Sequence, residues 1–159
     1  GHAIFSPGPD SGSLVLTGTL VVQHLSPVTL VAHATWGWQE NPAPGEYFDL
    51  GLGRGGPRVF GSHAFTGTRM RWGAVEARVP VSQDVFGLFG FGLSAFADYG
   101  GAWFEDQAPR RGGSIGLGAR LGATKNTGSD TYRFDLGYRV GEGFSGKRWA
   151  LAVGREVVF

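Results

Sequence analysis

Residues 89–100 read FGFGLSAFADYG, with an apolar or aromatic residue at nearly every second position. A period of two is typical of a β-strand that buries one face. In such a strand one face carries the six residues Phe89, Phe91, Leu93, Ala95, Ala97 and Tyr99. The opposite face is mostly glycine and polar, and it includes Ser94 and Asp98. This segment therefore predicts an extended strand with one apolar and one small or polar face.

The same alternation recurs along the chain. We expect about eight strands, at residues 13–25, 28–39, 46–53, 67–81, 85–100, 113–123, 131–140 and 147–159. Turn-forming residues such as Ser26-Pro27 separate several of them. About 20 residues per strand and connection suit an antiparallel meander. We therefore predict an all-β fold, with residues 1–12 as a flexible leader and residues 13–159 as a single β-barrel domain.

Composition excludes several classes of protein. The chain has 159 residues, enough for one domain, and no cysteine, which excludes disulfide scaffolds, thiol catalysis and cysteine-bound metal. Its net charge of +1 gives no strong attraction to nucleic acid. The four histidines have no metal-ligand spacing and no carboxylate cluster is present, so we predict neither a metal nor a cofactor.

Two architectures fit eight antiparallel strands. A soluble sandwich or barrel turns its apolar faces inward, whereas an outer-membrane barrel turns them toward lipid and its small or polar faces inward. Glycine accounts for 29 residues, and the less apolar strand faces carry glycine with charges of both signs. Glycine weakens a solvated strand but relieves crowding inside a narrow barrel. We expect an interior charge network of Glu76, Arg78, Asp98, Arg120, Arg133, Asp135 and Arg139.

The positions of the aromatic residues also favour a membrane barrel. Tryptophan and tyrosine near strand ends are typical of the belts that barrels place at headgroup depth. We expect such a girdle at Trp36, Trp38, Trp72, Tyr99, Trp103 and Trp149. The last expected strand ends at Phe159, and a terminal aromatic residue is the signal for insertion into a Gram-negative outer membrane. These observations predict an antiparallel transmembrane β-barrel of the outer-membrane type.

Four segments resemble a known family. Residues 55–67 are similar to its long extracellular loop, and residues 74–81 to its Glu-x-Arg-x-Pro strand. Residues 96–103 are similar to its Phe-x-Asp-x-Gly strand, and residues 114–121 with 133–138 to the next two strands. In this order they resemble the C-terminal barrel half of the outer-membrane protein assembly and two-partner secretion superfamily, the bacterial surface antigen family.

The resemblance implies a function and a loop motif. It implies the last eight strands of a barrel that usually has sixteen, working in protein insertion or translocation across the bacterial outer membrane. The loop motif corresponds to Gly55, Gly56, Arg58, Phe60 and Gly61. In the family an arginine directly before glycine and an aromatic residue pairs with the aspartate of the Phe-x-Asp strand, which is Asp98 here. Phe60 precedes Gly61 in this chain, so our hypothesis is that Arg58 takes the place of that arginine.

Two alternatives of other classes remain open, a closed structural or adhesive barrel and a lipid-modifying enzyme. An enzyme would need a nucleophile and a base, and the nearest candidates are His33, Ser94 and Asp98 on expected interior faces. No Gly-x-Ser-x-Gly element is present, so we do not predict an enzyme. The expected partners are the lipid bilayer with lipopolysaccharide and the barrel assembly machinery that inserts the chain. The sheet closes either alone or edge to edge with a second copy as a homodimer, because open edges do not persist in lipid.

Overall fold

The computed structural model describes residues 1–7, 11–52, 55–85, 88–123 and 130–157, and strands dominate it. Eight strands form one antiparallel sheet in the order β1-β2-β3-β6-β7-β8-β9-β10. Their bounds are β1 His2–Pro7, β2 Gly12–Leu25, β3 Val28–Glu40, β6 Arg69–Val85, β7 Phe89–Trp103, β8 Gly112–Ala123, β9 Asp130–Gly141 and β10 Trp149–Val157. The predicted all-β antiparallel fold is therefore confirmed.

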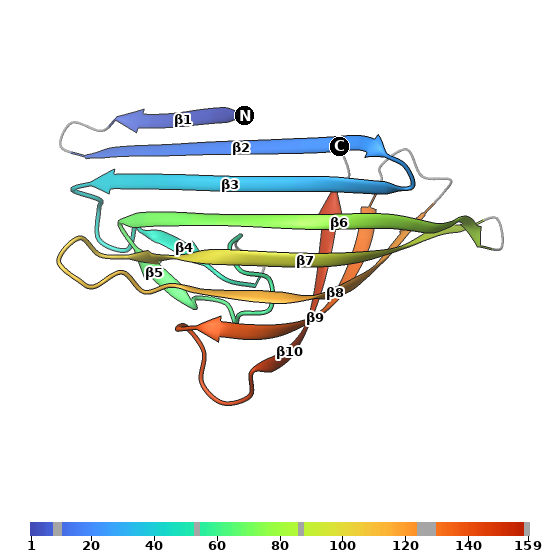
Figure 1. Cartoon of the computed structure of the whole chain (residues 1–159). Helices are drawn as coiled ribbons and strands as arrows, with labels where there is room; N and C mark the ends of the chain where they lie inside the picture. Colours follow the sequence, from blue (N-terminus) through green and yellow to red (C-terminus); the bar gives the residue numbers. More distant parts are fainter. Residues whose placement is uncertain (8–10, 53–54, 86–87, 124–129, 158–159) are drawn as a thin grey trace.

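Nearly all sheet neighbours are also neighbours in sequence. The exception is the pair β3 and β6, which flank an excursion of residues 41–68. That excursion contains a two-stranded hairpin of β4 Phe48–Leu50 and β5 Phe65–Gly67. It leaves the same end of the sheet as the connections 104–111 and 142–148. Figure 1 shows the sheet curving so that β8 to β10 turn behind β6 and β7, with the hairpin inside the curve.

Two expected elements differ from the structure. Residues 46–53 do not form a sheet strand, because only Phe48–Leu50 is extended there and it pairs with β5 inside the curve. The eighth strand is instead β1, whose residues His2–Pro7 pair with β2. The prediction of a leader over residues 1–12 is therefore wrong for this strand. The segment does alternate, with Phe48, Leu50 and Leu52 at every second position, but its apolar residues pack against the sheet instead of joining it.

The convex face of the sheet, called the outer face below, is apolar and exposed. Leu151 is 69% exposed, Leu117 68% and Leu20 63%. The concave face, called the inner face, buries charged side chains, with Asp135 at 0% and Glu76 at 3% exposure. A soluble sheet shows the opposite pattern, since water favours polar side chains on the exposed face. Among the described residues, no helix is long and apolar enough to cross a membrane.

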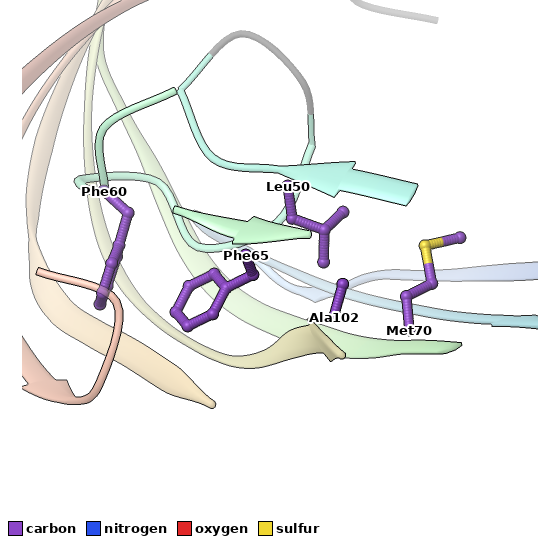
Figure 2. Close-up of a cluster of buried hydrophobic side chains, with 5 residues drawn as sticks. All are labelled: Leu50, Phe60, Phe65, Met70 and Ala102. Atoms are coloured by element: carbon purple, nitrogen blue, oxygen red, sulfur yellow. The ribbon is translucent and has the colours of Figure 1, made fainter. Parts of the chain in front are cut away.

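The largest apolar cluster lies between the hairpin and the inner face. Figure 2 shows its members gathered between β4, β5 and the strands that follow: Leu50, Phe60, Phe65, Met70 and Ala102. The rings of Phe60 and Phe65 lie 5.3 Å apart between centroids, and both side chains are 1% exposed. Burial of this kind stabilises by about 2 kcal/mol for each large side chain. The excursion is thus held inside the curve by a core of its own.

Candidate functional site: an infolded loop on a buried ion cluster

The loop of residues 51–64 enters the site through a glycine pair. Gly55 and Gly56 have φ of +81° and +91°, a left-handed region that side chains rarely adopt. A Cβ on Gly56 would also lie 2.9 Å from the Cβ of Leu50. The turn places Pro57, Arg58, Val59 and Phe60 against the inner face, where Pro57 and Phe60 are fully buried. The predicted loop motif therefore holds Arg58 in place, while Gly61 is exposed beyond it.

Arg58 connects the loop to two strands. Its Nη2 donates to Glu76 Oε2 of β6 at 2.8 Å, and its backbone N–H donates to Asp98 Oδ2 of β7 at 3.2 Å. Its Nε lies 3.9 Å from the same Asp98 oxygen. The guanidinium also stacks on Phe96, 4.7 Å from the ring centroid. The contact expected between Arg58 and Asp98 is present, and Glu76 is a second acceptor.

Glu76 is the centre of the ion cluster. Its Oε1 accepts from Arg120 of β8, with Nε at 2.9 Å and Nη2 at 2.5 Å. Its Oε2 is also 3.4 Å from Arg78 Nη2. Three guanidinium groups thus surround one carboxylate whose side chain is 1% exposed. Removing a partner of such a buried charge is costly because little water can replace it.

Asp98 is held by a residue that sequence reasoning missed. Ser114 of β8 donates twice to Asp98 Oδ1, from its backbone N–H at 2.9 Å and from its Oγ at 2.7 Å. Asp98 therefore joins the loop, β7 and β8 through one carboxylate. Ser114 lies directly opposite Asp98 in the β7–β8 pairing. Strand register could have revealed this contact, but the sequence alone does not give the register.

The remaining predicted charges lie on β9. Arg133 Nε is 2.5 Å from Asp135 Oδ2, so these neighbours on one face form an ion pair. Arg139 is different, because its Nε donates to the backbone carbonyl of Val59 in the loop at 2.5 Å. Its guanidinium also lies 5.7 Å from the Phe60 ring centroid. Six of the seven expected charges thus form ion pairs, and Arg139 holds the loop backbone instead.

Glycines of the inner face make room for this site. A Cβ on Gly137 would lie 2.9 Å from Val59 Cγ2, and one on Gly116 would lie 2.8 Å from Phe96 Cζ. A Cβ on Gly118 would lie 2.5 Å from Asp135 Oδ1 and 2.7 Å from Ser94 Oγ. The loop thus occupies the volume that a side chain would fill at Gly137, the ion cluster does so at Gly118, and Phe96 with the backbone of β9 does so at Gly116.

Five of the six residues predicted for the aromatic girdle lie on the outer face. Strand pairing puts Trp36, Trp38, Tyr99, Trp103 and Trp149 on the outer face, toward the end with the long connections. The prediction for Trp72 is wrong, because this residue shares the inner face with Glu76 and its ring lies 4.8 Å from that of His33. Side chains alternate between the two faces along β6, so residues 72 and 76, an even number of positions apart, lie on the same face. Phe159 lies outside the described residues.

The residues considered for an enzyme have other contacts. His33 Nδ1 is 2.9 Å from Thr19 Oγ1, and His33 Nε2 is 3.1 Å from Thr35 Oγ1. Asp98 is engaged with Arg58 and Ser114. Within the described residues, the hydrogen bonds of His33 join it to threonines and none joins it to a serine. Comparison of the chain with protein-family models, with curated proteins and with solved structures finds no match in any of the three.

Proposed function

We propose that this chain is a membrane-embedded β-sheet of the bacterial outer membrane that closes into a barrel. The support is its inverted polarity, with Leu117 and Leu151 exposed on the outer face and Glu76 and Asp135 buried on the inner face. Seven of the eight sheet strands have 9 to 17 residues. About 9–11 tilted residues span a bilayer.

Two aromatic belts support the orientation in the membrane. One lies at the end with the long connections and includes Trp36 and Trp149. At the opposite end Phe89 and Tyr132 stand on the outer face, 41% and 52% exposed. Amphipathic rings are favoured at both interfaces, and long connections are typical of the extracellular side. The outer face between the belts then contacts lipid, and headgroups of lipopolysaccharide meet the connections 104–111 and 142–148.

The infolded loop carries the more specific part of the proposal. The barrel acts in protein insertion or translocation, as the resemblance to the assembly and secretion superfamily implies. The single observation behind this is Arg58, which reaches Glu76 and Asp98 from a loop inside the curve. A structural barrel does not need a loop ion-paired to its inner wall. Insertion of the chain itself would require the barrel assembly machinery of the cell.

The test uses the full chain refolded into liposomes of phospholipid and lipopolysaccharide. We expect resistance of the sheet to added protease and a gel band that slows on boiling. Liposomes that contain the chain should also accelerate the insertion of a second, unfolded outer-membrane barrel relative to empty liposomes. An Arg58→Ala variant that inserts normally should lose this acceleration. A chain that stays in the aqueous phase overturns the membrane proposal, and an inserted chain without acceleration overturns the transport role alone.

A further inference from the structure

The two edge strands of the sheet have unfilled hydrogen-bonding positions. Among the described residues, β1 pairs only with β2 and β10 pairs only with β9. Each edge thus presents a row of backbone N–H and C=O groups along its outer side. In lipid such groups cost several kcal/mol each when unsatisfied, so an open edge cannot persist there. If the chain is in the membrane, both edges must find a partner.

Closure of one chain on itself conflicts with the infolded loop. An eight-stranded barrel has an interior just wide enough for the side chains of its own strands. Here the inner face already holds the β4–β5 hairpin and the buried residues Pro57, Val59, Phe60 and Phe65. The curved sheet also leaves a cavity of about 990 Å³ beside the loop. It is lined by His2 of β1, by Gly154 of β10 and by Arg58 of the loop. The two edges thus face the same cavity, and no backbone pairing joins them among the residues that the structure describes.

The geometry points to a second copy of this chain as the partner of both edges. This inference rests on the proposed membrane location. In the meander, β1 runs toward the end with the long connections and β10 runs away from it. Two copies inserted in the same orientation therefore place β1 of one beside β10 of the other in antiparallel pairing. The same pairing forms at the second seam, related by a twofold axis along the lumen.

The resulting ring has sixteen strands and two infolded loops. A barrel of this size encloses an aqueous lumen, which gives each loop the volume that an eight-stranded barrel lacks. Each copy supplies one half of the wall, so the interior is complete only when both are present. The partner surface is thus the pair of sheet edges, β1 and β10.

The experiment uses cysteine cross-linking, because the chain has no cysteine of its own. Ala3→Cys places a thiol on β1, and Leu151→Cys or Val153→Cys places one on β10, all on the outer face. Chains with the β1 cysteine and chains with the β10 cysteine carry different affinity tags, are refolded together into liposomes and are oxidised. Ala119→Cys, in the middle of the sheet with strands on both sides, is the control.

We expect a disulfide between differently tagged chains at the edges, and a heat-sensitive band at twice the mass of the chain. The control should give no cross-link. An Ala3→Cys/Val153→Cys chain that forms its disulfide within one monomeric barrel overturns the dimer and leaves the membrane proposal intact. Assemblies of more than two chains, or cross-linking of the Ala119→Cys control, also overturn it. Failure to enter liposomes overturns the proposed function instead, so the two failures are distinguishable.

Discussion

Arg58 is the residue on which the loop depends, since it contacts a carboxylate on each of two strands. We expect Arg58→Ala to lower the free energy of unfolding by about 3–5 kcal/mol, because Glu76 and Asp98 then lose a buried partner. Asp98→Ala should be comparably destabilising, and the double variant should cost less than the sum. Urea unfolding followed by tryptophan fluorescence measures all three. Arg110→Ala, in an exposed connection, is the control and should be close to neutral.

Gly137 controls whether the loop can lie on the inner face. A valine there would meet Val59, whose two methyl carbons lie 2.9 and 3.1 Å from the Cβ position. Overpacking of this kind costs about 1–3 kcal/mol, which corresponds to a shift of about 5- to 150-fold toward an open loop. In a Pro57→Cys background, which puts the thiol at a buried loop position and keeps Val59, Gly137→Val should raise the rate of maleimide labelling by that factor. Gly18→Val, where a Cβ meets nothing within 4 Å, should not change it.

At the scale of the element, a substitution on β8 can distinguish a sheet that faces lipid from one that faces water. Leu117 is 68% exposed near the middle of the strand. In a bilayer Leu117→Arg should destabilise the folded, inserted chain by about 2–4 kcal/mol, which is the cost of an arginine near the midplane. In water the same change would be neutral or would improve solubility. Asp106→Arg, in the exposed connection 104–111, is the control. Equal yields of folded chain from both variants would contradict a lipid-facing β8.

The strands show how far alternation alone leads. It predicted seven of the eight sheet strands. In these strands apolar residues such as Leu117 and Leu151 stand at every second position, and a period of two does not fit a helix. It missed β1, because this strand is short and residues 2–7 include a proline. It also mistook 46–53 for a sheet strand, since a short apolar run does not reveal whether it joins the sheet or packs on it. For the site, alternation along each strand predicted which face each charged residue occupies. The contacts of Ser114 and Val59 could not be predicted, because they depend on strand register and on the path of the loop.

For the whole molecule, the charge of the inner face predicts how a closed ring conducts ions. The described ion cluster has five arginines, Arg58, Arg78, Arg120, Arg133 and Arg139, against the three carboxylates of Glu76, Asp98 and Asp135. This leaves two net positive charges for each copy. Rings of arginine in a pore favour anions, because they concentrate the counter-ion where the dielectric constant is low. We therefore expect the inserted ring to pass chloride in preference to potassium.

The reversal potential across a planar bilayer under a KCl gradient measures this preference. Arg78 lines the cavity, and its side chain is 26% exposed. Arg78→Glu removes the net charge of each copy, so the reversal potential should move toward zero. Arg110→Glu changes the total charge of the chain by the same amount outside the cavity lining and should leave selectivity nearly unchanged. Cation preference in the unaltered chain would mean that the arginines are neutralised within the wall, and the lumen would then be shaped by the loop instead of by their charge.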